Sequence, residues 1–97
     1  MATYIVLANY TDQGIRNIGD TLNRADAVKE MARKAGVTMK ETFWTLGAHD
    51  VVAIFEAPDE ESMTALGLSL GKLGNVRTQT LRAFSAAEMK AIIRKAV

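Results

Sequence analysis

Two short segments of the chain are apolar at almost every position, residues 3–10 (TYIVLANY) and residues 50–57 (DVVAIFEA). Both are rich in β-branched and aromatic residues, and turn-forming residues follow each of them, which predicts two strands. Because successive side chains of a strand point to opposite faces of a sheet, a strand that is apolar throughout needs cover on both faces. The fold must therefore place these two strands in the middle of a sheet that is covered on both sides.

The other predicted elements surround these strands in a regular order. Two further strands are predicted over residues 37–46 and 75–84. Both carry charged or polar side chains, which are Lys40, Glu41, Arg77, Gln79 and Arg82. Helices are predicted over residues 23–36, from Pro58 toward Gly71 or Gly74, and after a capping box that begins at Ser85. The order is therefore β-α-β-β-α-β with one additional C-terminal helix.

This order predicts a ferredoxin-like α+β sandwich that forms a single domain over residues 1–97, with a four-stranded antiparallel sheet in the order 4-1-3-2. In that topology the first and third strands are central and the other two are edges. The charged side chains fall on the two predicted edge strands, where charge discourages open-ended pairing with other molecules. The polarity of the strands and the order of the elements therefore agree.

Composition and motif content exclude several classes of function. The net charge of +1 does not support nucleic-acid binding, and the absence of cysteine excludes disulfides and thiolate chemistry. The first apolar run is too short for a signal or membrane segment, so we expect a cytoplasmic protein without membrane contact. No phosphate-binding loop, dinucleotide fingerprint or metal-ligand spacing is present, and we expect neither a cofactor nor a metal.

The second face of the sheet needs an occupant, because the two predicted crossover helices cover only one face. The C-terminal helix is one candidate, since its apolar side chains fall on one side, namely Met89, Ile92, Ile93 and Ala96. The sheet of a second copy is the better candidate, because an extensive apolar sheet face is too large to stay exposed. The sequence therefore predicts a homodimer or a higher homo-oligomer.

Three stretches of the chain, YTDQGIRN, WTLGAHDVVAIFEAPDE and LGKLGNVRTQTLRAF, together resemble the GYD-domain family of small bacterial proteins. The likeness extends over almost the whole chain. It implies a dimeric α+β barrel, in which two ferredoxin-like sheets pack face to face, and it implies no established activity. The family's Gly-Tyr-Asp type motif corresponds to Gly47 to Asp50, where His49 stands in place of the usual tyrosine.

Polar side chains from distant parts of the sequence are expected to meet at one end of the sheet. In the predicted topology, the first and second strands end where the third and fourth begin. The candidate ligand-binding residues gathered there are Tyr10, Asp12, Trp44, His49, Asp50 and Arg77. Convergent polar groups at the mouth of a barrel favour a ligand site, here in a pocket between the sheet and the helices.

Each of these residues also has a structural interpretation, which is the more common one for its type. His49 is interpreted as a solvated residue of a hairpin. Asp50 and Asp12 are interpreted as caps for nearby backbone amides. Trp44 more often belongs to a core or an interface than to a ligand site. Arg77 on an edge strand is usually a solvated charge.

Two classes of function remain open. The first is a protein that binds a small apolar or aromatic molecule, or a cofactor-free enzyme that transfers a proton on such a molecule. His49 and Asp50 are its candidate catalytic residues, because histidine exchanges protons near neutral pH. The second class is a non-catalytic oligomer with a structural or regulatory role. The sequence favours small-molecule binding and assigns no reaction.

Overall fold

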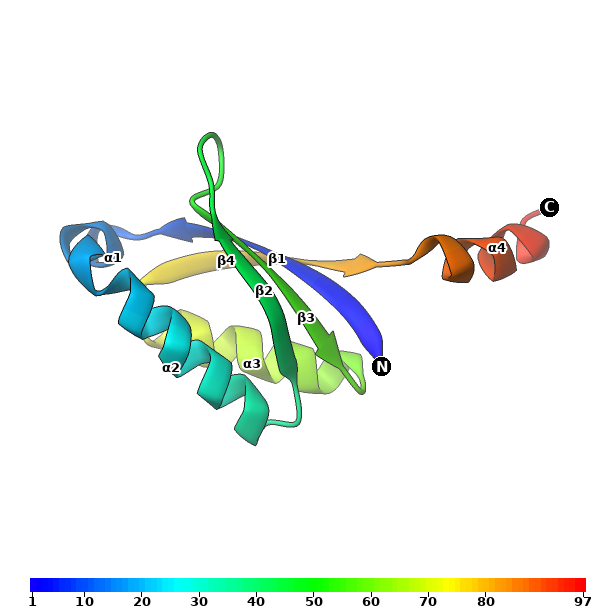
Figure 1. The fold of residues 1–97 in the computed structure, drawn as a ribbon, viewed down its shortest axis with the longest axis horizontal. Coiled ribbons are helices and arrows are strands. Elements are labelled where there is room, and N and C mark those ends of the chain that lie inside the picture. Colours follow the sequence, from blue (N-terminus) through cyan, green and yellow to red (C-terminus); the bar gives the residue numbers. More distant parts are fainter.

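The computed structural model describes residues 1–97 and forms one four-stranded antiparallel sheet with helices on one face (Figure 1). The elements are β1 (Ala2–Tyr10), α1 (Asp12–Arg16), the 3₁₀ turn η1 (Ile18–Asp20), α2 (Thr21–Lys34), β2 (Thr38–Trp44), β3 (Val51–Ala57), α3 (Glu60–Lys72), β4 (Val76–Ala83) and α4 (Ala86–Lys95). The strand order is β2-β3-β1-β4. This confirms the predicted ferredoxin-like arrangement, with β1 and β3 central and β2 and β4 at the edges.

Local sequence signals set the ends of the longer helices. The backbone of Gly36 has a φ of 77°, and its amide and that of Val37 donate to carbonyls in the last turn of α2. These bonds form a Schellman motif, which needs a residue that tolerates positive φ. Asp59 caps α3 by accepting from the Ser62 amide at 2.7 Å, a bond that lowers the pKa of the Asp59 carboxyl.

The segment between β1 and α2 is more ordered than the sequence indicated. Its residues were expected to form a turn, but they fold into α1 and η1 before α2 begins at Thr21. Thr11 caps α1 by accepting from the Gly14 amide at 3.1 Å. Asn23 therefore lies inside α2 rather than at its start, and its amide donates to the Asp20 carboxylate at 3.0 Å.

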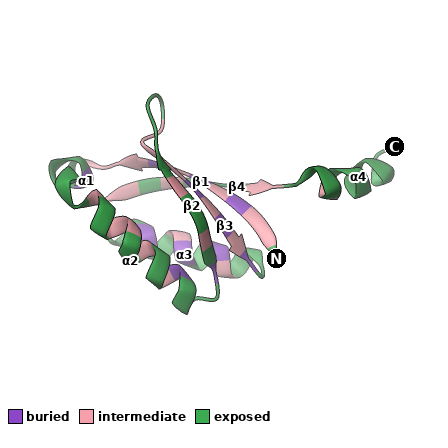
Figure 2. Cartoon of the chain, viewed as in Figure 1, coloured by how far each residue is buried: buried purple, intermediate pink, exposed green.

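The core lies between the sheet and helices α2 and α3. Alternate residues of β1 and β3 are buried on this side, and they pack against Met63 and Leu66 of α3 and Ala32 of α2. Figure 2 shows the buried positions on the facing sides of the sheet and these two helices. Phe55 and Met63 are the largest side chains with almost no exposed surface. Apolar burial of this kind is the main stabilising term of a small domain.

The opposite side of the sheet, here called the open face, has no cover in the monomer. Its apolar side chains lie opposite one another in the strand register and are Ile5, Leu7, Phe43, Val52, Ile54 and Leu81. Phe43 keeps 50% of its surface exposed and Leu81 keeps 39%. The two-sided apolar character of the central strands is therefore real, and only one side is buried within the chain.

Helix α4 does not cover the open face of its own chain. It projects from the end of β4, far from the helical layer, and it contributes no buried residue (Figures 1 and 2). Its contact with β4 is local: Arg82 lies 3.5 Å from the Glu88 carboxylate. The alternative in which this helix covers its own sheet is therefore wrong.

Strand β2 contains an irregularity that affects its side-chain directions. Met39 pairs with Phe55, but Glu41 rather than Lys40 pairs with Ile54, so Lys40 is an extra residue in a β-bulge. Beyond the bulge, Thr42 and Trp44 share the side of the core residues Ala53 and Phe55. No helix of the structure has the length and apolar character needed to cross a membrane.

Candidate functional site

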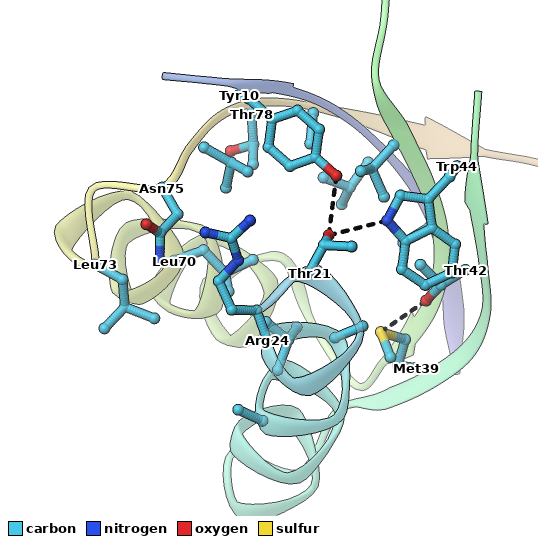
Figure 3. Close-up of a pocket in the computed structure, with 18 of the residues that line it drawn as sticks. Tyr10, Thr21, Arg24, Met39, Thr42, Trp44, Leu70, Leu73, Asn75 and Thr78 are labelled. Atoms are coloured by element: carbon cyan, nitrogen blue, oxygen red, sulfur yellow. Dashed lines mark hydrogen bonds between the residues drawn. The ribbon is translucent and has the colours of Figure 1, made fainter. Parts of the chain in front are cut away.

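A cavity of about 140 Å³, here called the helix-side cavity, lies between the sheet and the helices. Most of its lining residues are apolar and come from β1, β2, β3, α2 and the end of α3. Its deepest walls are buried side chains such as Val6, Phe55 and Leu70, whereas Trp44 and Leu73 at its edge are 43% and 53% exposed. The cavity therefore runs from an apolar floor to a partly exposed rim (Figure 3).

Thr21 connects two aromatic side chains on this rim. Trp44 donates from Nε1 to Thr21 Oγ1 at 3.0 Å, and the Tyr10 hydroxyl lies 2.9 Å from the same oxygen (Figure 3). The two hydroxyls carry two hydrogens, and their mutual bond uses only one of them. One hydroxyl hydrogen therefore stays free to donate to another group at the rim.

Arg24 is the one charged residue that lines the helix-side cavity. Its guanidinium points toward the centre of the lining side chains (Figure 3). It lies 5.8 Å from the centre of the Tyr10 ring, and Nη2 donates to the Gly14 carbonyl at 3.2 Å. The ion pairs of the chain are Glu30–Arg33, Lys40–Glu56 and Arg82–Glu88, so no carboxylate neutralises Arg24.

His49 lies at the same end of the sheet but outside the helix-side cavity. Its Nδ1 is 3.0 Å from Asn9 Oδ1, while the Asn9 amide nitrogen donates to the Ala48 carbonyl at 2.7 Å. Because that amide nitrogen is the donor, the amide oxygen accepts and His49 Nδ1 carries the hydrogen. Asn9 alternates with the core residues of β1, so this pair lies toward the open face.

Asp50 holds the central strands together at this end. Its carboxylate accepts from the Tyr10 amide at 2.9 Å, and its own amide donates to the Ala8 carbonyl at 2.9 Å. The structural interpretation of the sequence was that this side chain caps backbone amides of its own turn. The structure shows instead that it accepts from an amide at the end of β1. The contact is therefore structural, but it joins residues that are far apart in the sequence.

Asp12 and Arg77 also lie outside the helix-side cavity. Asp12 is exposed in the first turn of α1, and Arg77 is exposed on β4 opposite Asn9. Arg77 lines a separate, more polar hollow between α3 and β4. Of the candidate residues, Tyr10 and Trp44 therefore share the cavity, while the other four lie outside it. No group of three or more histidine or acidic side chains is arranged to hold a metal ion.

The comparison with known families agrees with the fold and its loops. The model of the GYD domain matches residues 4–93, which is nearly the entire chain. The chain belongs to the GYD-domain family. The likeness inferred from the loop motifs is thereby confirmed.

Two similar proteins come from the bacterium Thermus thermophilus. A protein named "Glutamine synthetase and cystathionine beta-lyase binding protein" is 33% identical over 90 residues, which is 92% of this GYD-domain chain and 95% of that protein. The crystal structure of TTHA0845 aligns with a TM-score of 0.56 at 27% identity, over 89% of this chain and 96% of that one. The first relative is therefore similar along almost its whole length and is named for the proteins that it binds.

The rim residues Thr21 and Arg24 of this GYD-domain protein's cavity were not among the site residues predicted from the sequence. Thr21 was overlooked because the helix was expected to begin after it, at residue 23. Arg24 was not singled out, although it is followed four residues later by Val28 on the same side of α2. A charged residue within an apolar helical stripe is the signal that could have revealed it.

Proposed function

We propose that this chain is a protein-binding protein that works as a homodimer and docks onto a metabolic enzyme. The observation that carries this proposal is the uncovered apolar open face together with the unpartnered helix α4. Both features leave large apolar side chains exposed in the monomer, among them Phe43, Leu81 and Ile93, and exposed apolar patches commonly mark protein–protein contact sites. A second copy of the chain is the occupant that we propose for the open face.

The open face suits a symmetric pairing of two copies. Its apolar side chains form a patch across β1, β2, β3 and β4 that is bordered on β4 by Gln79 and Arg77, and a two-fold axis brings identical patches together. Lys40 and Arg77 on the edge strands disfavour edge-to-edge association. Helix α4 presents Met89 and Ile92 with 40% and 37% of their surface exposed, and we propose that it packs on the partner. The cytoplasmic location expected from the sequence is part of the same proposal.

The enzyme partner is inferred from the relative's name. The aligned region covers 95% of that relative, so the relative has no further domain that could account for its binding to these enzymes. We therefore propose glutamine synthetase or cystathionine β-lyase as the enzyme that this chain binds. The test is sedimentation velocity of the purified chain mixed with each enzyme from the same organism. Co-sedimentation with one of them supports the proposal, and separate boundaries with both at tens of micromolar overturn it.

We propose a second function, the binding of a small apolar or aromatic molecule, because the helix-side cavity has an apolar floor and a polar rim. Tyr10 and Trp44 are the two sequence-predicted residues that would contact the ligand. His49 faces away from this cavity, so the geometry does not favour the alternative in which His49 acts as an acid or base on the bound molecule. Calorimetric titration with small aromatic compounds tests this function, and the absence of any heat of binding at millimolar concentration contradicts it.

A further inference from the structure

Arg24 is a cation in the wall of an otherwise apolar cavity, and no side chain of the protein neutralises it. Its protein contacts are one carbonyl oxygen and the face of the Tyr10 ring. A guanidinium carries five N–H donors, and the single bond to the Gly14 carbonyl leaves most of them free. Such a group, half-buried beside apolar side chains, binds an anion more strongly than a fully solvated arginine does, because less water competes for it.

The surroundings of Arg24 add to the attraction for an anion. One hydroxyl hydrogen of the Tyr10–Thr21 pair is also free to donate. The guanidinium of Arg24 and this hydroxyl are therefore two independent groups at the rim that can bind an anion.

The size and lining of the cavity limit the rest of the ligand. An apolar cavity of about 150 Å³ in a protein core accommodates benzene, and the helix-side cavity measures about 140 Å³. Its floor is formed by side chains without hydrogen-bonding groups, among them Val6, Ala53 and Phe55. The buried part of the ligand is therefore apolar and no larger than one aromatic ring or a short branched chain.

We infer that the helix-side cavity binds a small monocarboxylate, with its apolar body on the floor and its carboxylate on the Arg24 guanidinium. This inference rests on the proposed small-molecule binding and specifies the chemical class of the ligand. It is independent of the proposed dimer and of the enzyme partner. Arg24 is the residue that distinguishes an acid from a neutral molecule of the same shape.

The test compares phenylacetate with phenylacetamide, which has the same shape without the charge. Trp44 is the only tryptophan of the chain and lines the cavity, so its fluorescence reports binding, with calorimetry as a second readout. We expect phenylacetate to bind at least about tenfold more tightly than the amide. In Arg24→Gln the affinity for phenylacetate should fall about tenfold, while the affinity for phenylacetamide should change little. Lys29→Gln, which removes a charge from an exposed position of α2, is the matched control and should bind both probes as the wild type does.

A cavity-filling variant locates the binding site. Ala25→Leu places a larger apolar side chain in the cavity lining and should abolish binding of both probes while circular dichroism shows an intact fold. Equal binding of acid and amide, or unchanged acid binding in Arg24→Gln, overturns the carboxylate inference but leaves the small-molecule function standing. If neither probe binds at about ten millimolar, or if Ala25→Leu binds as the wild type does, both the inference and the small-molecule function fail.

Discussion

At Gly14 the backbone of α1 approaches the start of β4 so closely that no side chain fits. A β-carbon added there would lie 1.9 Å from the Asn75 carbonyl oxygen, which also accepts a hydrogen bond from the Thr11 amide at 3.1 Å. We predict that Gly14→Ala lowers the free energy of unfolding by about 1–3 kcal/mol, because the backbone must move to relieve the overlap. Urea denaturation measures the change.

Gly19→Ala is the control for that substitution. No atom lies within 4 Å of the β-carbon that it adds, so its unfolding free energy should stay within about 0.5 kcal/mol of the wild type. Equal stability of the two alanine variants would show that α1 adjusts freely against β4.

At the level of single residues, the sequence could predict which loops meet but not which face each side chain takes. Tyr10 and His49 were both assigned to one end of the sheet, and both lie there. Tyr10 points to the helix side, however, while His49 bonds to Asn9 toward the open face. The face that a side chain takes depends on whether its strand position is odd or even in the register, and for His49 also on how the hairpin before β3 folds. Amino-acid composition carries no information about either.

Among the elements, α4 depends most on its own sequence, because nothing in the monomer packs against it. The Ser85 hydroxyl accepts from the Glu88 amide at 3.1 Å, and the Glu88 carboxylate accepts from the Ser85 amide at 2.9 Å. We predict that Ser85→Ala costs about 1 kcal/mol of helix stability and lowers the helix content of residues 86–95. Carbon chemical shifts from nuclear magnetic resonance measure that content. Ser69→Ala, at an exposed position inside α3, should leave the α4 shifts unchanged.

The same capping box makes α4 sensitive to acid. The bond from the Ser85 amide, with a smaller contribution from Arg82, holds the pKa of Glu88 below its ordinary value. A carboxyl whose pKa is lower in the folded state stabilises the fold above its unfolded pKa, and that contribution is lost as the pH falls through the folded pKa. The helix content of α4 should therefore decrease on acidification below about pH 4.

Glu88→Gln separates this titration from the rest of the protein. Glutamine keeps the hydrogen-bonding pattern of the box but does not titrate, so the α4 signal of this variant should be flat over the same acidic range. An acid transition that persists in Glu88→Gln would assign the pH dependence to other carboxylates.

The order of the elements was largely predictable, and the reasons are local. Apolar strands, Gly36 after a helix and the Ser85–Glu88 box are short-range signals, and the structure confirms all of them. Helix α1 was missed because the sequence TDQG resembles a turn, and a five-residue helix leaves almost no periodicity to detect. The position of α4 was not predictable either, because its apolar side could face its own sheet or another chain.

For the whole molecule, the main question is what covers the open face. We predict that the wild type sediments as a dimer at micromolar concentration and that Ile54→Lys is monomeric. A dimer would bury the lysine in the middle of the apolar patch without an opposite charge to pair with it, which is unfavourable. Thr64→Lys, on the exposed side of α3, is the control and should remain dimeric. A wild type that sediments as a monomer at tens of micromolar would contradict the dimer.

Removal of α4 tests its part in the same assembly. A chain that ends at Phe84 retains every residue of the core, because α4 contributes none, so circular dichroism should show an intact sheet. We predict that its dimer is weaker and dissociates at a higher protein concentration than the dimer of the full chain, since the apolar side of α4 no longer packs on the partner. Identical dissociation curves for both chains would exclude α4 from the interface.

The bulge at Lys40 sets the phase of strand β2. If the residues after Met39 alternated regularly, without a bulge, Phe43 would fall on the side of the core and Trp44 on the open face. With it, Trp44 reaches Thr21 at the rim of the cavity and Phe43 joins Val52 on the opposite side. The bulge thus lets each side of the sheet keep its aromatic group although this strand carries one residue more than its partner. A relative without Lys40 would reach the same phase by regular alternation, so the length of this strand and its bulge must change together.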